Sequence, residues 1–197
     1  MGAGLVFKII KNRRAENKLT IQYAGNIGRT QGLNEFLEIF AESDNKDIDF
    51  DIWGSGAMKE ELVNFVNIKK LNDRISFNGV YSRAEQNYIL NSTDISLVTL
   101  SDGMYGLGVP SKAYNILASG KPILFIGQLN SEIALMILEN NIGFCFEPKD
   151  TRAIIKFLNG ISITEIESFK IMGAKARKIA ETIYSERIIL DKYTDKI

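Results

Sequence analysis

The chain has 197 residues, with 24 basic and 24 acidic side chains, a single cysteine and no histidine. This length suits one domain with an appendage, and zero net charge argues against a nucleic-acid binder, which needs surplus Lys and Arg to neutralise phosphates. The missing histidine excludes a Ser-His-Asp triad, a Cys-His pair and an HExxH zinc site. Cys145 cannot form an internal disulfide, which favours a reducing compartment.

Residues 1–18 are predicted to be a linker or tag remnant, and residues 19–197 the folded domain. The basic residues Lys8, Lys11, Arg13 and Arg14 follow a very short apolar stretch. A secretory signal peptide has the opposite order, with basic residues before a long apolar stretch. No apolar run in the chain approaches the roughly 18 residues that span a bilayer.

From Leu19 onward, short apolar runs alternate with segments of helical periodicity. Strands are predicted at 19–24, 48–53, 75–77, 95–100, 122–126 and 143–146. Helices are predicted from 33 to 40, from 58 to 66, after 82, at 111–119, at 133–138, after 150, and from 164 to about 184. Ser82 with Glu85, and Thr164 with Glu167, have the spacing of capping boxes. Strands separated by helices predict an α/β fold, a doubly wound, Rossmann-like parallel sheet of about six strands.

Three loops that follow predicted strands are rich in glycine, at 25–32, 54–56 and 101–112. In a doubly wound sheet such loops meet at one edge, where glycine lets backbone N–H groups approach an anion and helix N-termini add partial positive charge. Glycines that simply make tight turns are the alternative. The spacing of these loops matches neither G-x-G-x-x-G nor a P-loop, which argues against a dinucleotide enzyme or a P-loop nucleotidase.

Two cations are placed to meet a phosphate at this edge. Arg29 follows the first glycines, and Lys112 lies in the first turn of a predicted helix, where it opposes the helix dipole unless an anion is bound. A solvated lysine is the alternative for Lys112, and an N-terminal cap is the alternative for Ser111. Asp102 is the sole carboxylate of its loop, which disfavours a paired-carboxylate glycosidase.

Five segments, in order, resemble the family 4 (group 1) glycosyltransferases of the GT-B fold. They are 23–33, 53–56, 77–80, 109–124 and 139–143, together with Pro148 and Asp150. Residues 109–124 are similar to the branch whose donor-site helix reads P-S-K-x-Y-x-x-L-A-x-G-x-P. The resemblance covers about residues 19–193 and identifies the chain with the C-terminal, donor-binding half of such an enzyme, of the type that builds O-antigen and other polysaccharides.

The resemblance implies a site for a nucleotide-sugar donor, with no metal or other cofactor and no catalytic residue in this half. The first glycine-rich loop would lie against the diphosphate, the segment after the third strand would border the nucleobase, and the helix after Pro110 would contact diphosphate and ribose. The residues so implied are Gly25, Asn26, Gly28, Arg29, Gly54, Val80, Tyr81, Ser111, Lys112 and Asn115.

The sequence departs from this family pattern at several positions. The usual pair of glutamates would fall on Leu107 and Asn115, and the usual Arg and Lys of the first loop on Asn26 and Gln31. Asparagine can still form hydrogen bonds, but it lacks the charge. We expect Arg29 or Lys112 to supply the missing cation. The final helix would complete its path on an absent N-terminal domain, which predicts bare apolar surface at Ile179, Ile183, Ile188 and Ile189.

The implied activity is transfer, with retention, of a hexose or N-acetylhexosamine from an NDP-sugar, with UDP expected, to a lipid-linked saccharide of a bacterial surface polysaccharide. The expected partners are the donor and the absent N-terminal acceptor domain, and the expected location is cytoplasmic, peripheral to the inner membrane through the full-length protein. This chain alone is expected to be inactive. Two alternatives are a non-catalytic nucleotide-binding or nucleotide-sugar-binding module and a domain that serves only protein interaction.

Overall fold

The computed structural model describes residues 18–101, 103 and 111–183. Its six strands are β1 (Leu19–Ala24), β2 (Ile48–Trp53), β3 (Ile75–Gly79), β4 (Ile95–Thr99), β5 (Ile123–Ile126) and β6 (Gly143–Phe146). The α-helices are α1 (Leu33–Glu42), α2 (Lys59–Ile68), α3 (Gln86–Asn91), α4 (Ser111–Ser119), α5 (Glu132–Asn140), α6 (Thr151–Gly160) and α7 (Ile166–Ile183). Two short 3-10 helices are η1 (Arg29–Gln31) and η2 (Ile163–Glu165).

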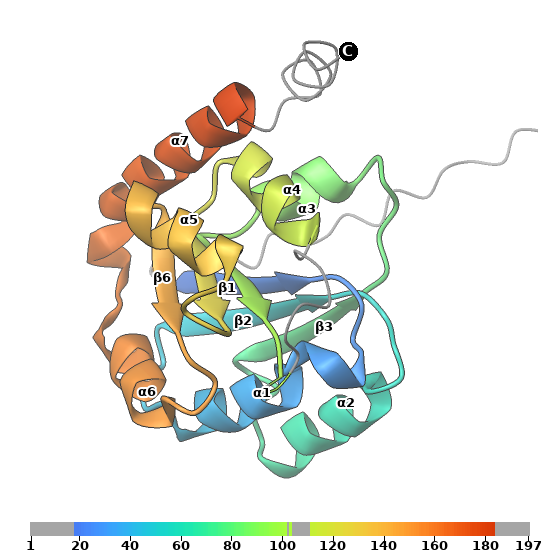
Figure 1. Cartoon of the computed structure of the whole chain (residues 1–197). Coiled ribbons are helices and arrows are strands. Elements are labelled where there is room, and N and C mark those ends of the chain that lie inside the picture. Colours follow the sequence, from blue (N-terminus) through green and yellow to red (C-terminus); the bar gives the residue numbers. More distant parts are fainter. Residues whose placement is uncertain (1–17, 102, 104–110, 184–197) are drawn as a thin grey trace, which may run out of the picture.

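All strand pairs are parallel, and the sheet order is β3-β2-β1-β4-β5-β6 (Figure 1). The predicted doubly wound sheet of about six strands is therefore confirmed. The order reverses between β1 and β4, the position at which open α/β sheets place their ligands, beyond the carboxyl ends of the strands. The site is thus expected around the loops that follow β1, β2 and β4.

Helices cover both faces of the sheet, and β5 is apolar on both of its sides. In β5, Leu124 and Ile126 pack into the core under α1, α2 and α6, whereas Ile123 and Phe125 pack into the core under α3, α4, α5 and α7. Figure 1 shows these two helical layers on opposite sides of the sheet. Every residue of β1 and β4 is buried, as expected for central parallel strands.

Helix α7 packs directly against α4, through two glycines. A Cβ atom on Gly173 would lie 2.0 Å from the backbone oxygen of Gly120, so glycine at this position allows the backbones to touch. Ile179 is 8% exposed and belongs to the core under α4. The expectation that Ile179 is bare is therefore wrong, while the side chain of Ile183, and Ile188 and Ile189, lie outside the described residues.

The capping box before the last helix differs from the prediction. Ser162 and Glu165 form it, and Thr164 instead contacts the Ser162 hydroxyl at 2.6 Å. The prediction of Thr164 with Glu167 is wrong because the chain begins to turn earlier, in η2, before α7 starts at Ile166. None of the described helices combines the length and the apolar character needed to cross a membrane.

Candidate functional site

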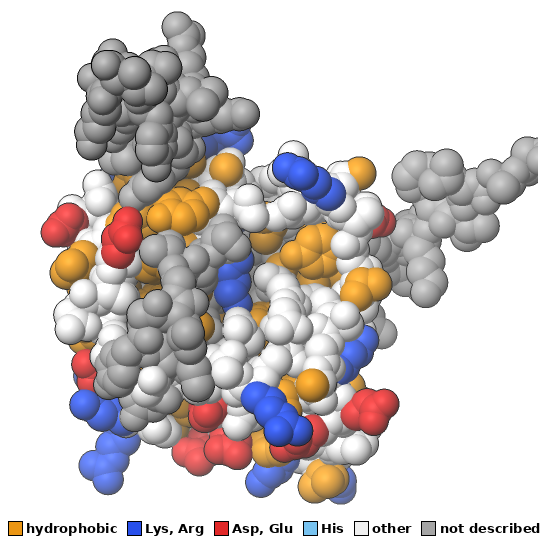
Figure 2. All heavy atoms as spheres, turned by 45° about the vertical axis from the view of Figure 1, so that its right-hand side comes forward, with side chains coloured by type: hydrophobic (Ala, Val, Ile, Leu, Met, Phe, Trp, Pro, Cys, Tyr) orange, Lys and Arg blue, Asp and Glu red, His pale blue; other side chains and the backbone are white. Residues whose placement is uncertain are grey.

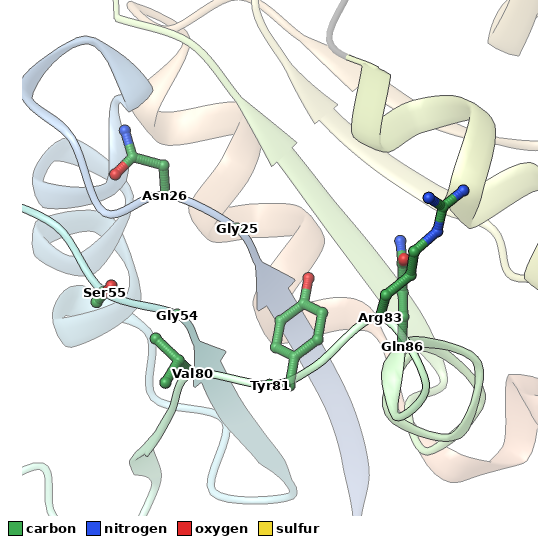
Figure 3. A pocket seen from close by; sticks show the side chains of 8 residues that line it. All are labelled: Gly25, Asn26, Gly54, Ser55, Val80, Tyr81, Arg83 and Gln86. Carbon is green, nitrogen blue, oxygen red and sulfur yellow. The ribbon is translucent and has the colours of Figure 1, made fainter.

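A hollow of about 450 Å³ opens at the carboxyl ends of β1, β2 and β3 (Figure 3). It is lined by Gly25, Asn26, Gly54, Ser55, Val80, Tyr81, Arg83 and Gln86. Five of these residues, namely Gly25, Asn26, Gly54, Val80 and Tyr81, belong to the set that the sequence predicted. The loops after β1 and β2 line the hollow, as the topology predicts. The segment after β3 completes it instead of the loop after β4, most of which lies outside the described residues.

The first two glycine-rich loops are in direct backbone contact. A Cβ atom on Gly54, whose φ is +134°, would lie 1.9 Å from the backbone oxygen of Gly25. The N–H of Gly25 donates to the Trp53 carbonyl at 2.9 Å, and that of Gly54 donates to the Gly79 carbonyl at 2.6 Å. These two N–H groups are therefore used within the protein, and the glycines serve to bring the loops together.

Lys112 extends from the first turn of α4 to the first loop. Its Nζ donates to Gln31 Oε1 at 2.9 Å and to Tyr23 Oη at 3.2 Å, and it lies 4.3 Å from the centre of the Tyr23 ring. A Cβ atom on Gly25 would lie 3.9 Å from the same Nζ. The ammonium group therefore sits at the side of the hollow formed by the first glycine-rich loop.

The charge on Lys112 has no carboxylate partner among the described residues, whose ion pairs involve other lysines and arginines. Burial lowers the pKa of Lys112 to about 8. Burial also raises the pKa of Tyr23, with a further contribution from Tyr81 nearby, so Tyr23 stays neutral. A partly buried cation held only by neutral groups destabilises the empty protein and is stabilised when an anion binds.

Other predicted residues do not line the hollow. Arg29 is exposed in η1, where its backbone oxygen accepts a hydrogen bond from Ser101 Oγ at 3.3 Å, and Gly28 is the N-cap of η1. Asn115 is exposed on α4, one turn after Ser111. Of the two expected cations, the structure therefore places Lys112, and not Arg29, next to the loop contact. Leu107, Asp102 and the side chain of Ser111 lie outside the described residues.

Arg83 and Gln86 line the hollow but were not predicted. Both side chains project on the side opposite Asn26 and Ser55, with the Tyr81 ring between the two groups (Figure 3). The turn that carries Arg83 is held by Ser82, whose N–H and hydroxyl both donate to Glu85 Oε2, at 2.8 and 2.7 Å. The sequence signal that could have found Arg83 is the predicted capping box of Ser82 and Glu85. The box follows β3 closely, so the turn that it holds, which includes Arg83, lies at the edge of the sheet.

Charged side chains are spread unevenly over the face shown in Figure 2. On this face, acidic side chains gather mostly toward the lower edge, and a basic side chain lies near the centre.

The part of the chain that the structure describes contains no cluster of three or more His, Cys, Asp or Glu side chains able to hold a metal ion.

The comparison with known families matches residues 7–179 to the family described as "Glycosyl transferases group 1". The probable glycosyltransferase WbjE of Pseudomonas aeruginosa is 36% identical over 181 residues, covering 90% of this chain and 44% of that protein. The putative colanic acid biosynthesis glycosyl transferase WcaI of Escherichia coli K12 is 29% identical, covering 71% of this chain and 34% of that protein. The chain thus spans less than half the length of these relatives.

Solved structures share the fold at low sequence identity. Anabaena Alr3699/HepE in complex with UDP matches with a TM-score of 0.74 and 14% identity, over 91% of this chain and 48% of that one. The C-terminal domain of a group 1 glycosyl transferase, LpcC from Francisella tularensis, matches with a TM-score of 0.68 and 20% identity, over 85% of this chain and 87% of that domain. The second match indicates that the fold exists as a unit of this size.

Proposed function

The chain belongs to the group 1 glycosyl transferases, and from this premise we propose that it is the domain that binds the nucleotide-sugar donor in such an enzyme. The observation that carries the proposal is the ammonium group of Lys112. It is partly buried beside the first glycine-rich loop, is held by the neutral groups of Tyr23 and Gln31, and has no described carboxylate to balance its charge. A diphosphate is an anion of suitable charge for this position.

In the proposed complex the diphosphate lies between Lys112 and the loop of Gly25 and Asn26, near the N-terminus of α4. The nucleobase lies against Val80 and Tyr81, and the start of α4, which carries Ser111 and Asn115, lies near the ribose and the phosphates. The lysine charge and the helix dipole would stabilise the negative charge that develops on the leaving diphosphate as the glycosidic bond breaks. The domain would thus contribute electrostatic stabilisation, which requires no histidine.

The finer assignments extend the proposal. The complex of HepE with UDP supports UDP as the nucleotide of the donor, and the description of WcaI as a colanic acid biosynthesis glycosyl transferase supports a bacterial surface polysaccharide as product. We propose that the transferred sugar is a hexose or N-acetylhexosamine. We propose a retaining reaction with a lipid-linked saccharide acceptor, held by a second domain of the longer protein at the cytoplasmic face of the inner membrane. Metal ions and other cofactors are not expected to take part.

Titration calorimetry of the chain with UDP, GDP and ADP tests donor binding directly. We expect UDP to bind, Lys112→Ala to weaken its affinity at least tenfold, since a charge-assisted hydrogen bond contributes about 1.5–3 kcal/mol, and Arg29→Ala to have a smaller effect. The exposed Lys175→Ala serves as the matched control. If none of the three nucleotides binds, the chain is an interaction domain and the proposal is wrong.

A non-catalytic nucleotide or nucleotide-sugar module is the second candidate. It is favoured by Asn115, which stands where the family usually has a glutamate that holds ribose hydroxyls. The two candidates differ in one outcome, the transfer of sugar from UDP-sugar after the remainder of the longer protein is supplied. Transfer supports the enzyme, whereas tight donor binding without transfer supports the module. Asn115→Glu, which restores the usual side chain, would then be expected to raise donor affinity in either case.

A further inference from the structure

Three elements that are distant in the sequence meet at the ammonium group of Lys112. Lys112 is on α4, Tyr23 is on β1 and Gln31 is in η1, so the contacts join residues 89 and 81 positions apart. Tyr23 is fully buried, and its hydroxyl donates to the Asn26 carbonyl at 2.5 Å. The same hydroxyl therefore accepts from the cation and holds the loop that lines the hollow.

We propose that Tyr23 and Gln31 are positioning residues, neutral acceptors that hold the ammonium group of Lys112 against the first glycine-rich loop so that it meets the diphosphate of the donor. This inference rests on the proposed function and adds to it two residues that neither line the hollow nor belong to the expected donor contacts. It also implies that donor binding requires an ammonium group at this place beside the loop, whether the lysine that carries it is residue 112 or residue 31.

Neutral acceptors are suited to this role. An ammonium group has three N–H donors, and here two of them bond to the Tyr23 hydroxyl and the Gln31 amide oxygen. A carboxylate in either place would orient the ammonium equally well but would cancel its charge before the ligand arrived. The hydroxyl and the amide fix its position while the positive charge stays available to an anion.

The geometry of Gln31 and Lys112 makes the inference testable by exchange. Gln31 Oε1 and Lys112 Nζ are 2.9 Å apart, so the ends of the two side chains meet at one point although their backbones belong to different elements. A lysine at position 31 and a glutamine at position 112 would therefore place an ammonium group and an amide at nearly the same two positions. Tyr23 would remain beside both.

The first experiment compares the wild type, Lys112→Gln, Gln31→Lys and the double exchange by calorimetry with UDP-glucose at neutral pH. Lys112→Gln is expected to lose at least tenfold in affinity, and the double exchange is expected to recover to within about threefold of the wild type. Gln31→Lys alone places two cations together and should unfold at a lower temperature. A double exchange that binds no better than Lys112→Gln overturns the inference.

This outcome is separable from failure of the proposed function. If the wild type does not bind UDP-glucose, donor binding itself is wrong. If the wild type binds and Lys112→Gln binds equally well, donor binding stands and the positioning role is wrong.

The second experiment follows affinity against pH, with UDP-glucose as the probe because it lacks the terminal phosphate group that titrates near pH 6. Burial alone accounts for the lowered pKa of Lys112, about 8. The titratable group in contact with it is Tyr23, and Tyr81 lies near Tyr23. Wild-type affinity should be constant below about pH 8 and fall above it as the ammonium loses its proton.

Tyr23→Phe removes one acceptor of the ammonium group, so the pH at which affinity begins to fall should move lower by about half a unit or more. Tyr88→Phe, at a tyrosine that is 57% exposed, is the matched control and should leave the profile unchanged. A purely structural Tyr23 would weaken binding equally at every pH with no shift, and that result would overturn the assignment for Tyr23.

Discussion

Substituting Gly54 by alanine tests the loop contact on which the site depends. The added Cβ would lie 1.9 Å from the Gly25 oxygen and 2.9 Å from the Gly25 carbonyl carbon, and Gly54 has a φ of +134° that other residues rarely adopt. Backbone strain of this kind costs about 1–3 kcal/mol, and overpacking against fixed atoms costs about another 1–3 kcal/mol. We expect Gly54→Ala to lower the free energy of unfolding by about 2–6 kcal/mol.

Gly79→Ala separates the two contributions. Gly79 also has a positive φ, +84°, but a Cβ there would meet nothing within 4 Å. It should therefore show the strain without the clash, at about 1–2 kcal/mol. The difference of about 2 kcal/mol between the two variants measures the loop contact.

Urea unfolding provides the assay. With an m-value of about 2 kcal/mol per molar, the two variants should differ by about 1 M in their midpoints. Gly54→Ala should also weaken UDP binding because it displaces Gly25, which lies beside Lys112. Equal midpoints for Gly54→Ala and Gly79→Ala would refute the view that the loops are held by direct backbone contact.

Three further predictions concern other parts of the molecule. Arg83→Ala should weaken UDP binding about threefold to tenfold, because the side chain lines the hollow. It should leave the melting temperature unchanged, because the side chain is exposed. A drop in melting temperature with unchanged affinity would contradict a role of Arg83 in binding. Gly173→Ala should destabilise the chain by about 2–4 kcal/mol in urea unfolding, because its Cβ would lie 2.0 Å from the Gly120 oxygen. Gly160→Ala is the control and should not destabilise the chain, because a Cβ there meets nothing within 4 Å. Similar urea midpoints for the two variants would contradict the α4–α7 contact. Burial raises the pKa of the Cys145 thiol to about 12, so a thiol reagent at pH 8 should modify the native protein much more slowly than the urea-unfolded chain. Equal labelling rates for the two would contradict the raised pKa.

The fold was predictable because the strands carry an unambiguous signal. Runs such as Ile123–Ile126 are apolar at every position, which indicates burial on both faces of a parallel sheet, and the intervening periodicity indicates helices. The error at Thr164 and Glu167 arose because two capping-box spacings overlap, and only tertiary structure decides where the helix starts. Likewise, Ile179 was expected to be bare, but it packs under α4 through a helix contact that depends on Gly120 and Gly173.

The site was predictable only in part. Gly25, Gly54 and Tyr81 follow strands, so their place at one edge of the sheet follows from topology. The contacts of Lys112 with Tyr23 and Gln31 depend on how far a long side chain reaches between elements, which no local pattern encodes. Glycine in the first two loops was interpreted as exposing N–H groups to an anion, but the N–H groups of Gly25 and Gly54 bond to neighbouring carbonyls.

The central claim is that Lys112 is kept charged and partly buried for an anionic donor, at a cost to the stability of the empty protein. The pKa of Lys112 falls from 10.5 to about 8 on folding. The charged lysine therefore lowers the free energy of unfolding below pH 8, and this loss of stability disappears as the pH rises toward 10.5. The cost corresponds to about 3 kcal/mol. Lys112→Met should therefore make the empty chain more stable at pH 7, by at least about 1 kcal/mol.

The most direct test is the free energy of unfolding at pH 7, with and without UDP, for the wild type and Lys112→Met. UDP at about one hundred times its dissociation constant should stabilise the wild type by about 2.7 kcal/mol. The variant is predicted to be more stable than the wild type without UDP and to gain almost nothing when UDP is added. A variant that is less stable than the wild type and gains as much from UDP would contradict the claim.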